Sequence, residues 1–76
     1  MIFNRSPGHE LQLMMMEKNL DVRALQEQIN LNEFVICEIL CERQKITKKI
    51  ARQLAIVSGL SPEFWTKLQL EFNNDR

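Results

Sequence analysis

Apolar residues recur at helical spacing in five separate stretches of the chain. Leu11, Met14 and Met15 follow an i, i+3, i+4 pattern that marks the inner side of a first helix. The longest stripe belongs to the fourth stretch and consists of Ile46, Ile50, Leu54 and Val57. We expect helices at roughly residues 9–18, 22–29, 33–41 and 48–58, and a fifth helix that begins at residue 62. The pattern therefore predicts an all-α fold of five short helices.

Capping residues mark where these helices should begin and end. Side chains with an acceptor oxygen precede four of the stretches and are expected N-caps: Asp21, Asn32, Thr47 and Ser61. Gly59 is the expected end of the fourth helix. Asn30 is expected to end the second helix in a left-handed conformation, and Pro7-Gly8 to form a break before the first helix. We expect one domain over residues 1–76, with a flexible arm at residues 1–6 and a frayed tail at residues 73–76.

The second and third helices and the short turn between them have the layout of a helix-turn-helix. The third helix would then enter the major groove of DNA, where its first residues read base edges. The candidate base contacts are Asn32, Glu33, Phe34 and Cys37. The candidate phosphate contacts follow in the next loop and the next helix, at Arg43, Lys45, Lys48 and Lys49. The sequence thus predicts a DNA-binding surface, although its reading helix contains no arginine, lysine or glutamine.

Charge is distributed unevenly along a chain whose formal net charge is zero. Residues 10–42 contain seven acidic side chains against Lys18 and Arg23, whereas residues 43–52 contain five basic side chains and no acid. Glu38 and Glu42 would oppose DNA phosphates, and the basic run would attract them. The alternative interpretation of the basic run is a solvated loop and helix end.

Apolar residues that fall outside the expected core suggest contacts with another protein. Leu13 and Met16 lie on a second face of the first helix, and we expect a partner contact there. Trp65 is expected in the core, whereas Leu68 and Phe72 are expected in the interface of a homodimer. Met14 and Met15 fit core packing better than a surface role. A protein-interaction module without specific DNA reading is therefore the alternative to a DNA-binding regulator.

Composition argues against several other classes of protein. The beginning of the sequence has no signal-peptide pattern and no stretch is long enough to span a bilayer, so we expect a cytoplasmic protein with reduced cysteines. Cys37, Cys41 and the single His9 are too few for a zinc site in one chain. A half-site completed across a dimer is one interpretation of the two cysteines, and small apolar filler is the other. We predict no catalytic residues, no metal and no cofactor.

The most specific motif of the chain is Ser61-Pro62-Glu63-Phe64-Trp65, and it occurs together with Pro7-Gly8, the segment Leu20–Ile39 and Ile46-Thr47. These segments resemble those of HigA-type antitoxins, which are Xre-like helix-turn-helix regulators. The resemblance runs from Pro7 to about Phe72. The resemblance implies a five-helix, lambda-repressor-like domain that forms homodimers, binds palindromic operator DNA and represses its own operon. It also implies a possible partner, a HigB-type toxin that cleaves mRNA, although other members of the family have no toxin.

The sequence departs from this family mainly on the surface that would face DNA. Asp21-Val22 replaces the usual Ser-Gln, Gln26 replaces a small residue, and Asn30 replaces the glycine of the turn. Residues 32–34 replace the usual Ser, Arg and Gln of the reading helix, and residues 41–44 replace a loop of the type Asn-Gly-Lys-Arg. The expected function is therefore a HigA-like regulator and antitoxin with a divergent reading helix.

Overall fold

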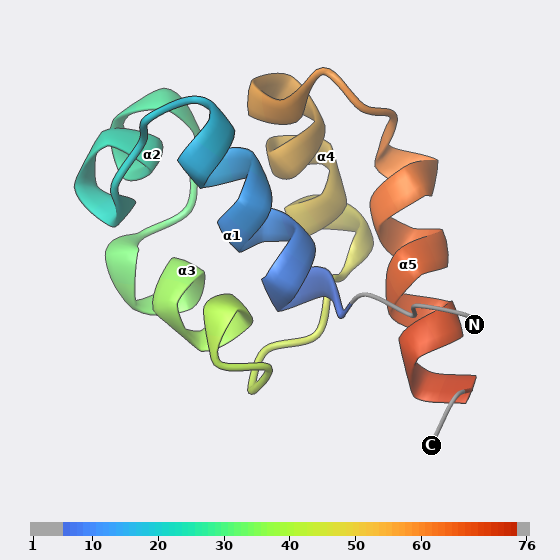
Figure 1. Ribbon diagram of the computed structural model, residues 1–76. Coiled ribbons are helices and arrows are strands. Elements are labelled where there is room, and N and C mark those ends of the chain that lie inside the picture. The colour runs from blue at the N-terminus through green and yellow to red at the C-terminus, as the bar shows by residue number, and fades with distance from the viewer. Residues whose placement is uncertain (1–5, 75–76) are drawn as a thin grey trace.

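Five α-helices and no strand make up residues 6–74, which are the residues that the computed structural model describes (Figure 1). The helices are α1 (Pro7–Glu17), α2 (Val22–Gln28), α3 (Glu33–Leu40), α4 (Lys48–Ser58) and α5 (Pro62–Asn74). The predicted all-α architecture is confirmed, and the predicted bounds of α4 match those observed. The predicted arm, apart from Ser6, and the last two residues of the predicted tail lie outside the described residues.

The predicted caps are present and explain where the helices begin. Asp21 Oδ1 accepts a hydrogen bond from the Ala24 amide at 2.8 Å, and Ser61 Oγ accepts one from the Phe64 amide at 3.2 Å. Gly59 ends α4 with a φ of 79°, a left-handed conformation that glycine adopts without a steric penalty. Each cap satisfies a backbone group that would otherwise lack a partner at a helix end.

The first helix begins earlier than predicted, because Pro7 and Gly8 belong to it rather than preceding it. Ser6 is the N-cap and accepts from the His9 amide at 3.1 Å, and proline suits the first helical position, where its missing N–H is not needed. A Cβ atom at Gly8 would lie 2.5 Å from the Ile39 carbonyl oxygen. Gly8 therefore allows α1 to cross α3 at close range. Ser6 was expected in the flexible arm but is instead the N-cap of α1.

The turn between α2 and α3 does not contain the predicted left-handed residue. Ile29 ends α2 in an extended conformation, and the non-glycine residues with positive φ in the described chain are Asn19 and Glu42. The Asn30 amide instead donates a hydrogen bond of 2.9 Å to Oε1 of Gln53 on α4. The expectation for Asn30 was wrong because a tertiary hydrogen bond, rather than a local left-handed turn, satisfies this part of the backbone.

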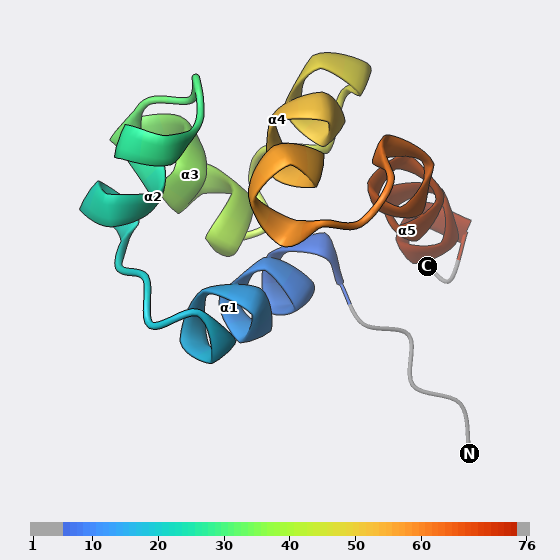
Figure 2. The ribbon, with the colours of Figure 1, turned by 90° about the horizontal axis from the view of Figure 1, so that it is seen from above.

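The core lies where all five helices meet. Figure 2 shows α4 between the α2–α3 pair and α5, with α1 lying across one side of this row. Trp65, Leu11, Leu25, Ile36, Ile39 and Leu54 are fully buried, and Met14 and Met15 are also in the core, as predicted. The prediction that Trp65 lies in the core is confirmed. Phe64 is 37% exposed, and its ring contacts the Trp65 ring edge-to-face. Burial of these apolar side chains is the main stabilising contribution.

A buried glutamine fixes the segment that leads into α4. Gln69 on α5 is 8% exposed, and its Oε1 accepts a hydrogen bond of 2.9 Å from the Ile46 amide. A buried amide without a partner is costly, so this bond determines how the segment before Lys48 passes α5. The end of α5 also differs from the prediction, because the helix includes residues 73 and 74, which were expected in a frayed tail.

Candidate functional site

The predicted base-reading residues lie at the start of α3 and are exposed. Phe34 is 71% exposed, and the side chains of Glu33 and Cys37 are also open to solvent. Asn32 is exposed as well, but its Oδ1 caps α3 by accepting from the Val35 amide at 2.9 Å. Its amide nitrogen is the part of this side chain left for another contact. The outer side of α3 therefore presents an acid, an aromatic ring, a thiol and one amide group.

Two of the charges that follow on α3 and in the next loop neutralise each other. Arg43 Nη1 lies 3.7 Å from Glu38 Oε2, and the arginine side chain is 71% exposed. An exposed pair at this distance contributes little to stability. Its effect is on the local surface charge, because it places one of the four candidate phosphate contacts beside one of the two acids that would repel phosphate.

Glu42 is directed toward the start of α1 and has a structural contact there. Its carboxylate accepts a hydrogen bond from the Ser6 hydroxyl, and its backbone has a φ of 64°. A carboxylate near a helix N-terminus interacts favourably with the helix dipole. Sequence reasoning placed Glu42 among the residues that oppose DNA, whereas the structure gives this carboxylate a partner within the domain.

The first turn of α4 concentrates positive charge at the end of a helix where positive charge is unfavourable. Lys48 and Lys49 are its first two residues, both are exposed, and the first turn contains no acid. The helix dipole places partial positive charge there, and the backbone N–H groups of the first turn add to it. Neither lysine forms an ion pair with any other residue in the described range 6–74. The first turn of α4, preceded by exposed Lys45, is therefore a part of the described surface that should attract anions.

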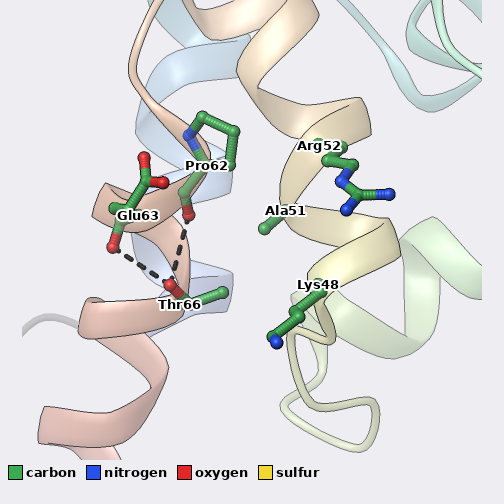
Figure 3. A pocket seen from close by; sticks show the side chains of 6 residues that line it. All are labelled: Lys48, Ala51, Arg52, Pro62, Glu63 and Thr66. Carbon is green, nitrogen blue, oxygen red and sulfur yellow. Dashed lines mark hydrogen bonds between the residues drawn. The ribbon is translucent and has the colours of Figure 1, made fainter.

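Lys48 also lines a cleft between α4 and α5 that sequence reasoning did not predict. The cleft has a volume of about 320 Å³, and its lining comes from both helices: Lys48, Ala51, Arg52, Pro62, Glu63 and Thr66 (Figure 3). The Thr66 hydroxyl donates to the carbonyl oxygens of Pro62 and Glu63 within its own helix. Lys48 and Glu63 are fifteen positions apart, so only the packing of α4 on α5 brings them to one cleft.

The predicted partner contacts differ in how far they are exposed. Met16 is 66% exposed, whereas Leu13 is half-buried. Leu68 is partly buried against the core and Phe72 is half-buried, so both are only partly available for an interface. Ile56, which was not a candidate, is 66% exposed on α4. Ile56 lies outside the apolar stripe that runs from Ile46 to Val57. Its exposure could therefore have been predicted from the helical spacing of the sequence.

The cysteines and the remaining polar groups give no sign of a metal site. Cys37 and Cys41 are free and exposed, so the interpretation of these side chains as small apolar filler was wrong. Within residues 6–74, no group of three or more His, Cys, Asp or Glu side chains is arranged to hold a metal ion. In the same range, no helix combines the length and the apolar character that crossing a membrane requires.

Comparisons with known proteins add no relative from which a role could be transferred. No protein-family model matches the chain, and no curated protein matches it significantly. The candidate site is therefore defined by the geometry and charge of its residues alone. It brings Lys45, Lys48 and Lys49 together at the start of α4 and leaves the α3 residues as a separate acidic and apolar surface.

Proposed function

We propose that this protein is a DNA-binding regulator of the helix-turn-helix type, in which α2 and α3 form the motif and α4 contacts the DNA backbone. The observation that carries the proposal is the first turn of α4, where Lys48 and Lys49 have neither an acidic neighbour in that turn nor an ion-pair partner in the described chain. Positive side chains together with backbone N–H groups at a helix start are suited to bind a phosphate.

The proposed role of α3 is more limited than in a strongly basic reading helix. Glu33 would accept a hydrogen bond from a cytosine amino group, and Phe34 would contact a thymine methyl group. The Asn32 amide nitrogen remains available, since its oxygen is engaged in the cap. Affinity would then depend mainly on Lys45, Lys48 and Lys49, and specificity on a few contacts of α3.

The resemblance to HigA-type antitoxins supplies the rest of the proposal. A lambda-repressor-like dimer in the cytoplasm would place two α3 helices about 34 Å apart, one turn of DNA, over a palindromic site. It would repress its own operon and, where a HigB-type toxin is present, neutralise it. The proposed activity is binding, and it involves no catalytic residue and no cofactor.

The decisive experiment is a titration of the full chain against duplex DNA from its own upstream region at several salt concentrations. We expect dissociation constants of about 10⁻⁸ M or below near physiological salt, and a scrambled duplex should bind roughly a thousandfold more weakly. The logarithm of the association constant should fall linearly with the logarithm of the salt concentration. Micromolar binding that does not depend on sequence would contradict the proposal.

The dimer has a test of its own that uses two neighbouring residues on α5. Phe72→Asp should convert a dimer into a monomer, because it would place a charge inside the proposed interface. Leu70→Asp is the control, since Leu70 is 60% exposed and lies on a different side of the helix. Light scattering after size-exclusion chromatography measures the mass directly. A dimer that persists in Phe72→Asp would show that the interface lies elsewhere.

The second candidate function is protein binding without DNA, and the exposure of Phe34 and Met16 favours it. Their side chains are 71% and 66% exposed, and a partner protein would remove this apolar surface from water. Phe34→Ala should leave the free energy of unfolding within about 0.5 kcal/mol, because the ring is outside the core. Loss of toxin binding in this variant, in a protein whose DNA binding is weak and independent of sequence, would favour the second function.

A further inference from the structure

A side-chain hydrogen bond joins α4 to the turn between α2 and α3. Oε1 of Gln53, in the middle of α4, accepts a bond of 2.9 Å from the backbone amide of Asn30. Gln53 is half-buried, and Asn30 is exposed in the short segment that leads into α3. Since α4 lies between the α2–α3 pair and α5 in Figure 2, Gln53 is on the side of α4 that faces the turn. The bond therefore connects the two parts of the proposed DNA-binding surface.

Two apolar side chains also hold this turn, but their contribution is of a different kind. Ile29 and Leu31, on either side of Asn30, are each 8% exposed and belong to the core. Burial of apolar surface is not directional, so it keeps the turn against the core. A hydrogen bond weakens steeply when its distance or angle changes. The bond to Gln53 is thus a directional contact that limits how far the turn can shift along α4.

Gln53 shares a side of α4 with one of the two lysines that are proposed to bind phosphate. Lys49 comes four positions before Gln53, and side chains four positions apart in an α-helix are neighbours on one face. Lys48 instead lines the cleft toward α5. A phosphate bound by Lys49 would therefore lie on the side of α4 from which Gln53 reaches the turn. A short series of contacts links backbone binding at α4 to the start of α3.

We infer that Gln53 is a positioning residue for sequence discrimination, an inference that rests on the proposed function. Phosphate contacts carry no sequence information of their own, but they fix the register of a protein on the duplex. While the bond between Gln53 and Asn30 is formed, α3 keeps one position relative to Lys49. The start of α3 then meets the same base edges each time Lys49 meets its phosphate. Without this bond, phosphate binding persists and discrimination between sequences falls.

The test is the ratio of the affinities of the full chain for the upstream duplex and for its scrambled counterpart. Gln53→Met keeps a side chain of similar length without the acceptor. It should weaken binding to the upstream duplex roughly tenfold, as the loss of one base contact does, and leave the scrambled duplex and the salt slope unchanged. Gln53→Glu keeps an acceptor oxygen, so it should keep the ratio although its charge lowers both affinities. Gln12→Met, which alters an exposed glutamine on α1, is the matched control.

Amide hydrogen exchange of the free protein measures the contact without DNA. The Asn30 amide should be protected in the original protein and in Gln53→Glu, and it should lose this protection in Gln53→Met. The Val35 amide, which donates to the Asn32 cap, should stay protected in all three. Because Asn30 is exposed, water can replace the lost acceptor, and Gln53→Met should remain folded. An Asn30 amide that is unprotected in the original protein would overturn the inference.

The remaining outcomes separate the inference from the function on which it rests. An original protein that binds the two duplexes equally would refute the proposed function and the inference together. If the original protein discriminates, the same ratio in Gln53→Met would refute the inference alone. A fall of both affinities by one factor in Gln53→Met would show a merely structural role for Gln53, and it would refute the inference as well.

Discussion

The helices α3 and α4 begin in the same way and have opposite charge in their first turns. Asn32 and Thr47 are extended N-caps, and each accepts a hydrogen bond from the amide three positions later, at 2.9 and 3.3 Å. The first turn of α3 then contains Glu33, whereas the first turn of α4 contains Lys48 and Lys49. Because the caps are alike, the difference between the two helix starts is mainly electrostatic.

This difference separates what stabilises a helix from what binds a ligand. An acid in the first turn interacts favourably with the helix dipole, so Glu33 stabilises α3 and repels anions. Lysines in the first turn interact unfavourably with the same dipole, so Lys48 and Lys49 cost α4 some stability and attract anions. In the proposed function, α3 would be the reading helix, and α4 would supply the positive charge for DNA affinity.

The largest expected effect comes from removing the charge of α4. The double variant Lys48→Gln and Lys49→Gln should lower DNA affinity on the order of tenfold for each lysine near 0.1 M salt, and the salt slope should fall by about 0.9 for each phosphate that the variant no longer neutralises. Fluorescence anisotropy at several salt concentrations measures both quantities. Glu33→Gln is the comparison from α3, and we expect it to raise affinity slightly. An unchanged slope in the double variant would show that α4 does not face phosphate.

A smaller effect should follow when the two caps are removed one at a time. Asn32→Ala and Thr47→Ala should each lower the free energy of unfolding by about 1 kcal/mol, since each leaves an amide at a helix start without its acceptor. In a domain of this size, that corresponds to a fall in the melting temperature of roughly 4–8 °C. Calorimetry checks both variants. A cost confined to one of them would mean that the two helix starts are not equivalent.

The smallest expected effects have opposite signs in the two helices. Glu33→Gln should lower the free energy of unfolding by about 0.3–1 kcal/mol, and Lys49→Gln should raise it by a similar amount, because each removes one charge from the field of a helix dipole. Urea unfolding at low salt resolves such changes when both variants are measured beside the original protein. Both differences should shrink at about 1 M salt. Equal signs for the two variants would refute the electrostatic comparison.

Local signals in the sequence were sufficient to predict most of the helix bounds. Thr47 and Gly59 allowed α4 to be predicted at both ends, because a capping hydroxyl and a left-handed glycine act within a few residues. The predicted start of α1 was wrong because proline and glycine often break helices, so Pro7 and Gly8 were placed before the helix. Proline is also well suited to the first turn of a helix, and that is its role here. The choice between these two roles depended on Ser6 and on the close crossing with α3.

The parts of the site that could not be predicted depend on contacts between distant residues. The acceptor for the Asn30 amide is Gln53, twenty-three positions away, and the partner of Glu42 is Ser6, thirty-six positions away. The cleft likewise exists only because α4 packs against α5, which brings Lys48 and Arg52 near Pro62 and Thr66. Spacing along one helix predicts which side is apolar, but it does not predict which polar side chain will meet another helix.

Trp65 provides an intrinsic fluorescence signal for the folding of this domain. It is the single tryptophan of the chain, it is fully buried, and its indole Nε1 donates to the Ser58 hydroxyl at 3.2 Å. Unfolding would expose the ring to water and shift its emission to longer wavelength. The residue adjoins α4 through Ser58 and is followed directly by Thr66 of the cleft. Emission from one natural fluorophore therefore offers a label-free signal for the docking of α5 on α4.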